Sequence, residues 1–144
     1  MTFAVVTGGG TSGHVIPAMS ICEALIDAGH NAADVKYVGT IRGVETSLMA
    51  DSPVESLFLP ISGLQRSFSA RGILRNMALP WRLLRSRLVA RRFLSKWSPK
   101  VVVSVGGYAS EPMSRAAIAA GIPLVCVSYD HLAGLATRRQ AKHA

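Results

Sequence analysis

The architecture of this chain follows from residues 3–14, FAVVTGGGTSGH. The first five residues are apolar or β-branched and predict a short buried strand, and the glycines that follow allow a sharp turn. Apolar residues then recur at helical spacing from Ile16 to Ile26, until Gly29 ends the pattern. We therefore predict a strand, a glycine loop and a helix in direct succession.

The same alternation of strand and helix repeats along the chain. Strand patterns cover 35–38, 54–59, 101–105 and 124–127, and helical patterns cover 43–50, 80–97, 113–120 and the segment from 132 onward. Pro80 is expected in the first turn of its helix, where a missing N–H is tolerated. The repetition predicts an α/β fold, a Rossmann-like parallel sheet with helices on both faces. Ligands bind such sheets at the carboxyl ends of the strands.

Length and composition indicate one globular domain. The chain has 144 residues, of which 49% are hydrophobic and 17% charged, and this suits a folded core. It has no apolar run of about 18 residues, and its start lacks the basic region of a signal peptide. Cys22 and Cys126 have no metal-type spacing and are expected to be small buried residues. We therefore expect a cytoplasmic protein without a metal site.

Positive charge is concentrated in one part of the chain. The formal net charge is +8, and ten basic residues but no acidic one lie from Arg66 to Lys100. This concentration predicts an anionic partner such as an acidic lipid or a phosphorylated substrate. No nucleic-acid-binding motif accompanies the charge, and aromatic residues make up only 6% of the chain. We therefore expect no nucleic-acid partner.

A helix over residues 80–97 would carry two different faces. The face expected to pack on the sheet carries Leu83, Ala90, Phe93, Leu94 and Trp97. The opposite face carries what we call the arginine–leucine patch: Trp81, Leu84, Arg85, Leu88 and Arg92. This mixture predicts binding to an anionic membrane surface, with apolar side chains at the acyl boundary and arginines at the headgroups. The alternative interpretation is an ordinary solvated arginine face.

The glycine loop is suited to a phosphate, because backbone N–H groups and the positive end of the next helix attract anions. Gly8, Gly10 and Gly13 also fit the GxGxxG pattern of dinucleotide sites. The acidic residue that such a site needs at the end of the second strand is missing, so only an NADP site that uses Arg42 stays open. A P-loop is excluded because His14 stands where lysine is required.

His14 follows the loop and has two interpretations. A histidine at the start of a helix often only packs or caps. Beside a loop that holds a phosphate, a neutral imidazole can instead accept a proton from a sugar hydroxyl. We therefore take His14 as the candidate catalytic base.

Four segments in order carry a more specific pattern than one glycine loop. They are GGTSGHVIPA at 9–18, ISGL at 61–64, GGYASEP at 106–112 and AGL at 133–135. Together they resemble the signature segments of the MurG-like glycosyltransferases of family 28. The resemblance is collinear and covers nearly the whole chain, and four ordered segments at matching spacing are specific.

The resemblance implies the two-domain GT-B architecture, of which residues 1–144 are the N-terminal, acceptor-binding domain. A C-terminal donor-binding domain, absent from this chain, would hold UDP-N-acetylglucosamine. The implied reaction is inverting, uses no metal or cofactor, and transfers N-acetylglucosamine to a polyprenyl-pyrophosphate-linked muramyl sugar. It converts lipid I to lipid II for peptidoglycan synthesis, and the enzyme is peripheral, at the cytoplasmic face of the cell membrane.

Carried over residue by residue, the resemblance also implies site residues. Gly10, Thr11, Ser12 and Gly13 would line the diphosphate or donor site, His14 would meet the acceptor hydroxyl, and Tyr108 and Ser110 would flank the acceptor pocket. Two positions depart from the family pattern. Ser12 replaces a glycine, which is tolerable if its φ is negative. Asp130 stands where the family has an asparagine that touches substrate, and a carboxylate accepts but does not donate a hydrogen bond.

Asp130 keeps a different acceptor open, namely another polyprenyl-pyrophosphate sugar. In that alternative the chain is the membrane-anchoring subunit of a split, two-chain glycosyltransferase. In both cases we expect a partner domain or subunit to supply the nucleotide-sugar pocket, because 144 residues hold no second domain.

Overall fold

The computed structural model describes residues 1–41, 43–61, 79–129 and 134–144. Its strands are β1 (Ala4–Gly8), β2 (Val35–Thr40), β3 (Glu55–Leu59), β4 (Val101–Gly106) and β5 (Leu124–Cys126). Its α-helices are α1 (Ser12–Asp27), α2 (Glu45–Leu48), α4 (Leu79–Trp97), α5 (Glu111–Ala119) and α6 (Leu135–Gln140). Three short 3₁₀ turns complete the described elements: η1 (Ala32–Asp34), η2 (Tyr108–Ser110) and η3 (Ala141–His143).

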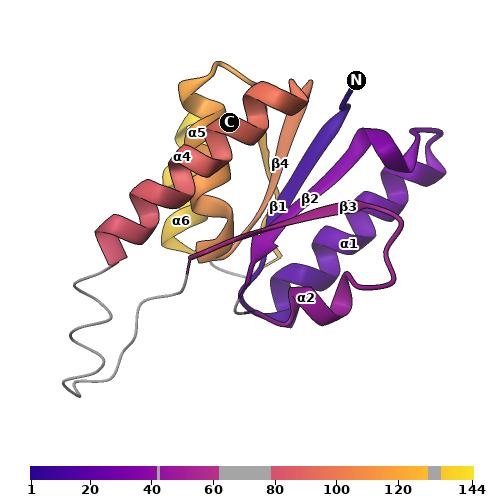
Figure 1. Cartoon of the computed structure of the whole chain (residues 1–144), viewed down its shortest axis with the longest axis horizontal. Helices are drawn as coiled ribbons and strands as arrows, with labels where there is room; N and C mark the ends of the chain where they lie inside the picture. The colour runs from indigo at the N-terminus through magenta and orange to yellow at the C-terminus, as the bar shows by residue number, and fades with distance from the viewer. Residues whose placement is uncertain (42, 62–78, 130–133) are drawn as a thin grey trace.

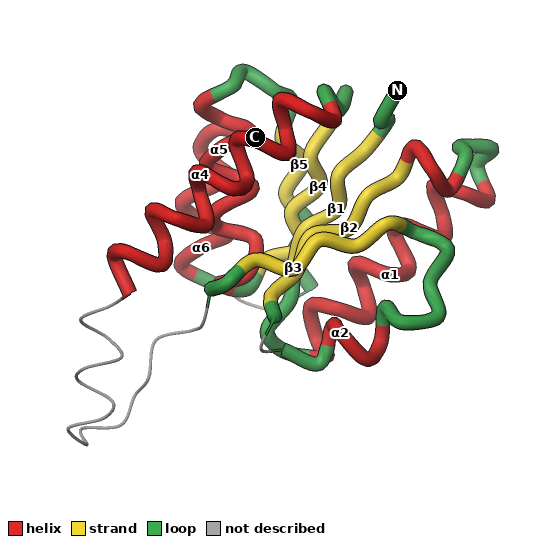
Figure 2. Tube along the Cα trace, in the orientation of Figure 1, coloured by secondary structure: helices red, strands yellow, loops and turns green. Residues whose placement is uncertain are grey.

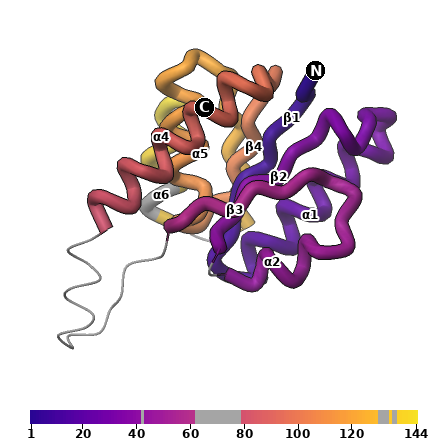
Figure 3. Tube along the Cα trace, viewed as in Figure 1, coloured from indigo at the N-terminus to yellow at the C-terminus, as the bar shows by residue number. Residues whose placement is uncertain are grey.

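The five strands form one parallel sheet in the order β3-β2-β1-β4-β5. β1 is the central strand, and its Ala4 lies opposite Val35 of β2 and Val101 of β4. Figure 3 shows β1 and β4 side by side although they lie far apart in the sequence. The predicted parallel α/β sheet is confirmed.

Helices cover both faces of this sheet, as predicted. α1 and α2 lie on one face, and α4 and α5 lie on the other (Figures 1 and 2). Successive strand residues point to opposite faces, so Val5 packs in the core with α4 and α5 while Val6 packs in the core with α1. The apolar run of β1 therefore supplies both cores.

α4 packs on the sheet by the face that the helical spacing predicted. Pro80 is the second residue of the helix. Ala90, Leu94 and Trp97 are buried, and Leu83 and Phe93 pack partly buried against the same core, as does Val89. Truncating a buried leucine such as Leu94 to alanine costs about 2–5 kcal/mol, so this face anchors the helix.

Some boundaries differ from the prediction. α2 is one turn, shorter than the predicted segment 43–50. β5 ends at Cys126, although the Val127 N–H still donates to the Ser104 carbonyl at 2.8 Å. The described part of the last helix begins at Leu135, and the predicted start at 132 lies outside the described residues.

Candidate functional site

Two described loops meet at the carboxyl edge of the sheet. The glycine loop, residues 9–13, follows β1, and a turn at 107–110 follows β4, the strand beside β1. A Cβ added to Gly107 would lie 2.5 Å from the carbonyl oxygen of Gly9, so the two loops touch through their backbones. Asp130, which follows β5 in the sequence, lies outside the described residues, and so does Arg42.

The inner half of the glycine loop is tied to the protein interior. The Tyr37 hydroxyl donates to the Gly8 carbonyl at 2.6 Å, and the Gly10 N–H donates to Glu45 Oε1 at 3.0 Å. Gly10 has φ +92°, and a side chain there would overlap the Tyr108 ring. The Gly10 N–H thus points to a carboxylate inside the protein and not outward, while the predicted place of Gly10 in the binding site stays a prediction.

The outer half of the loop is open. Thr11, Ser12 and Gly13 are exposed, and α1 begins at Ser12 with no acidic residue in its first turn. The first N–H groups of a helix find no partner within it, and this end carries partial positive charge. Among the described residues, Ser98 is the one non-glycine with positive φ, so Ser12 meets the condition for replacing a glycine. An anion therefore has access to residues 11–13.

His14 lies in the first turn of α1 and is partly exposed. Its ring packs against the turn after β4: a Cβ on Gly106 or Gly107 would lie 3.4 Å from a ring carbon. Its Nδ1 lies 2.9 Å from Thr11 Oγ1. In a neutral imidazole one ring nitrogen carries a hydrogen and donates it, and the other accepts. The role of Nδ1 in the contact with Thr11 therefore decides whether Nε2 carries a hydrogen. The imidazole is thus beside the open end of α1, as predicted.

The turn after β4 brings Tyr108 to the site but keeps Ser110 away from it. Tyr108 is half-buried with its ring against Gly10. Ser110 is fully buried, and its hydroxyl donates to the Gly107 carbonyl at 3.0 Å and accepts from Gln140 Nε2 at 3.2 Å. Gln140 Oε1 in turn accepts from Ser104 of β4 at 2.7 Å. Ser110 thus holds the turn together, and its predicted place beside an acceptor pocket stays a prediction.

Glu45 is the site residue that the sequence analysis missed. It is fully buried in α2, and it binds the Gly10 N–H across the sheet edge. Burial, and then the charge of Glu45, raise the pKa of the neighbouring Tyr37 above its usual value. The available signal was helical spacing, because Glu45 lies four residues before the buried Met49 and thus on the inner face of α2.

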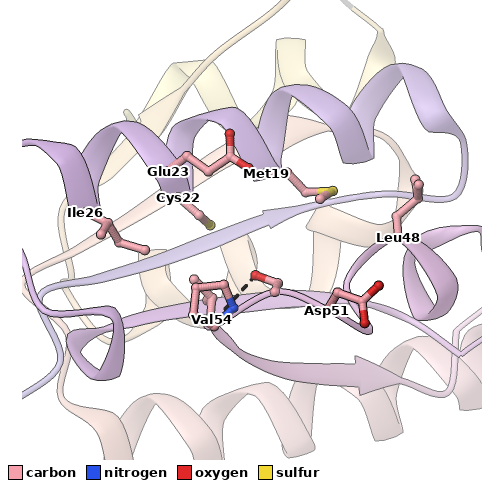
Figure 4. A pocket seen from close by; sticks show the side chains of 9 residues that line it. Met19, Cys22, Glu23, Ile26, Leu48, Asp51 and Val54 are labelled. Atoms are coloured by element: carbon pink, nitrogen blue, oxygen red, sulfur yellow. Dashed lines mark hydrogen bonds between the residues drawn. The ribbon is translucent and has the colours of Figure 1, made fainter.

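A separate hollow of about 170 Å³ lies between α1 and the segment 48–54 (Figure 4). Cys22 lies on its wall, and burial together with the nearby Glu23 raises the pKa of the thiol to about 12. The thiol therefore stays protonated at neutral pH and is a poor nucleophile. Among the described residues, no group of three or more His, Cys, Asp or Glu side chains could hold a metal ion. The sheet edge remains the candidate site.

The arginine–leucine patch lies on the outer face of α4. Trp81, Leu84 and Leu88 are 74%, 46% and 55% exposed, and Arg85 and Arg92 are exposed beside them. Arg87 is different, because its guanidinium pairs with Glu111 of α5. In the part of the chain that the structure describes, no helix is long and apolar enough to cross a membrane. The predicted exposure of the patch is confirmed.

The chain is similar to known glycosyltransferases over nearly its whole length. The model of the glycosyltransferase family 28 N-terminal domain matches residues 4–144. A UDP-N-acetylglucosamine--N-acetylmuramyl-(pentapeptide) pyrophosphoryl-undecaprenol N-acetylglucosamine transferase from Anaeromyxobacter sp. (strain K) is 40% identical over 93% of this chain and 34% of its own length. A transferase of the same name from Christiangramia forsetii is 34% identical over 97% of this chain and 37% of its own.

A solved structure shows the same fold. The crystal structure of Acinetobacter baumannii MurG superposes with a TM-score of 0.83 and 26% identity, over 100% of this chain and 40% of that one. The chain thus spans little more than a third of the length of the proteins it matches.

Proposed function

Because the chain belongs to glycosyltransferase family 28, we propose that it is the acceptor-binding domain of a UDP-sugar-dependent hexosyltransferase. In this proposal N-acetylglucosamine passes from UDP-N-acetylglucosamine to a muramyl sugar on a polyprenyl pyrophosphate, the reaction for which the similar transferases are named. A C-terminal donor-binding domain or subunit supplies the pocket for the nucleotide sugar.

The observation that carries the proposal is the open end of α1 beside an imidazole. Residues 11–13 are exposed at a helix N-terminus, where a pyrophosphate is favoured. His14 lies in the same first turn. An acceptor whose pyrophosphate binds at 11–13 therefore brings its sugar close to the imidazole.

His14 acts in this proposal as the general base. This role requires the tautomer in which Nδ1 holds the hydrogen and donates it to Thr11 Oγ1, 2.9 Å away, and in which Nε2 is the basic nitrogen. Nε2 takes the proton of the acceptor 4-hydroxyl while that oxygen bonds to the anomeric carbon of the donor sugar. The bond from this carbon to the UDP oxygen breaks, UDP leaves, and the configuration inverts. The reaction uses no cofactor or metal in this proposal, and the helix end balances part of the charge of the acceptor pyrophosphate.

The arginine–leucine patch holds the domain at the cytoplasmic face of the cell membrane, where a polyprenyl-linked acceptor is found. Its exposed Trp81, Leu84 and Leu88 reach the acyl boundary, and Arg85 and Arg92 meet anionic headgroups. Each arginine near the surface contributes about 1 kcal/mol. Sedimentation with liposomes tests this role. Binding should rise with the content of anionic lipid and fall with the salt concentration. Binding that depends on neither would contradict the contribution of the arginines.

The activity is tested by a transfer assay on the enzyme that carries this domain together with its donor-binding domain or subunit. With radiolabelled UDP-N-acetylglucosamine and lipid I, the expected product is labelled lipid II. Transfer only to a different polyprenyl-pyrophosphate sugar would replace the acceptor named here. Absence of transfer to any such lipid would contradict the proposed function.

A further inference from the structure

Glu45 is a carboxylate held inside the protein at the edge of the candidate site. Its Oε1 accepts three hydrogen bonds, each of 3.0 Å: from the Gly10 N–H, from the Thr40 N–H and from Thr40 Oγ1. Its Oε2 is buried and has no hydrogen-bond partner among the described residues. Glu45 thus joins the end of β2 to the glycine loop after β1.

Keeping such a carboxylate inside the protein costs free energy. A buried charge loses its hydration, and apolar residues of similar volume often give equal or greater stability. Stability alone therefore does not account for a glutamate at this position. Its distinctive property is the direction in which it pulls one backbone N–H of the loop.

Three glycines leave the room that Glu45 occupies. A side chain on Gly9 or Gly43 would overlap the carboxylate, and a Cβ on Gly39 would lie 2.8 Å from Glu45 Cγ. Two of these glycines, Gly39 and Gly43, lie outside the glycine loop. The close fit from three directions holds the carboxylate in one place.

We propose that Glu45 is a positioning residue for the acceptor pyrophosphate. By taking the Gly10 N–H inward, it fixes where the loop ends and α1 begins, so that the anion meets the open N–H groups of Ser12 and Gly13. Its negative charge also keeps the anion away from the inner half of the loop. This inference rests on the proposed function, because it takes the bound anion to be the pyrophosphate of the acceptor.

Two substitutions separate the hydrogen bonds from the charge. Glu45→Gln keeps an oxygen that accepts the bonds from Gly10 and Thr40, whereas Glu45→Ala removes them all. We expect Glu45→Ala to weaken binding of inorganic pyrophosphate to the 144-residue chain by about tenfold or more, since a bond to a charged acceptor is lost. Glu45→Gln should stay within about threefold of the wild type. Glu23→Ala, which removes an exposed carboxylate from α1, is the matched control and should change binding by less than about twofold.

Hydrogen exchange of the Gly10 amide gives a second readout that needs no ligand. Protection should be lost in Glu45→Ala and kept in Glu45→Gln, while the amides of β1 and β4 stay protected in both. A purely structural role predicts a lower melting temperature but unchanged pyrophosphate affinity well below it. If Glu45→Ala does not fold, Thr40→Val removes only the hydroxyl bond to Oε1, and a smaller loss of affinity is expected.

Gly43→Ala tests the same contact from the other side. Its methyl group should displace the carboxylate, so it should reproduce the effect of Glu45→Ala and add little in the double variant. Gly134→Ala is the control, because a Cβ there meets nothing within 4 Å. Additive effects of Gly43→Ala and Glu45→Ala would overturn the inferred contact.

The outcomes distinguish the two proposals. A wild-type chain that does not bind pyrophosphate overturns the proposed function and, with it, the role of Glu45 toward the anion. A wild-type chain that binds, together with a Glu45→Ala variant that binds equally well and keeps Gly10 protected, overturns only the positioning role.

Discussion

The two halves of the glycine loop, counted from Gly8 at the end of β1, differ in what they contact. Residues 8–10 are tied inward by Tyr37 and Glu45 and are closed over by Tyr108. Residues 11–13 are exposed and open α1. A glycine-rich loop can therefore serve two purposes along its length: its first residues allow close packing, and its last residues give an anion access to the helix N-terminus. Substitutions in the two halves should therefore have different kinds of effect.

The largest effect is expected beside the outer half, at His14. Removing a general base lowers turnover by about 10²–10⁴-fold, so His14→Ala in the complete enzyme should lower kcat by this factor with little change in the KM for the donor. His30→Ala is the control, because that ring stacks on Phe3 before β1 begins. Unchanged turnover in His14→Ala would remove the imidazole from the chemistry.

Gly10→Ala should destabilise the protein by disturbing the packing of the inner half of the loop. Alanine at φ +92° is strained, and its methyl group would overlap Tyr108, so we expect a loss of about 2–4 kcal/mol in the free energy of unfolding. Gly29→Ala is a matched control with φ +96° and nothing within 4 Å of the added Cβ. It should lose only about 1–2 kcal/mol. Urea unfolding measures both, and equal losses would show that the Tyr108 contact contributes nothing.

Tyr37→Phe should lower the free energy of unfolding less than Gly10→Ala does. It removes the donor to the Gly8 carbonyl, which is buried, and a lost bond of this kind costs about 1–2 kcal/mol. Tyr129→Phe, at an exposed hydroxyl, is the control and should change stability little. A Tyr37→Phe variant as stable as the wild type would show that the bond to Gly8 is not needed.

The pKa of Tyr37 adds a pH dependence to that comparison. Burial and then Glu45 raise this pKa above its usual value of 10.0. The Tyr37 hydroxyl of the folded protein then keeps its proton at a pH where the unfolded chain loses it. The free energy of unfolding that Tyr37 contributes is therefore complete below pH 10 and declines above pH 10. The stability gap between the wild type and Tyr37→Phe should therefore narrow above pH 10, as thermal melts at several pH values can check.

The smallest effect is expected at Ser12 in the outer half. Its side chain is exposed and its backbone is not strained. Ser12→Gly should therefore change the free energy of unfolding by less than about 0.5 kcal/mol. Binding of inorganic pyrophosphate should change by less than about threefold, as isothermal titration calorimetry would show. A tenfold loss of affinity would assign the Ser12 hydroxyl a direct contact with the anion.

The fold could be predicted from the sequence because its signals are local. The apolar run of β1 is buried on both faces, so Val5 and Val6 both had to be apolar. The two faces of α4 follow from helical spacing alone, and Pro80 marks its first turn.

The site could be predicted only in part, because its hydrogen bonds join distant residues. The position of His14 follows from its place directly after the loop. The partner of the Gly10 N–H is Glu45, 35 residues further on, and no spacing rule links a one-turn helix to a loop on another strand. The hydrogen bond to the Ser110 hydroxyl could not be predicted for the same reason, since its donor, Gln140, lies 30 residues away.

The central claim is that an anion binds at residues 11–13 and not at the inner half of the loop. Titration of the ¹⁵N-labelled chain with inorganic pyrophosphate tests it most directly by NMR. We predict saturable shifts of the Ser12 and Gly13 amides, with the Gly10 amide still protected from exchange. Shifts confined to the arginines of α4, or loss of Gly10 protection on binding, would contradict the claim.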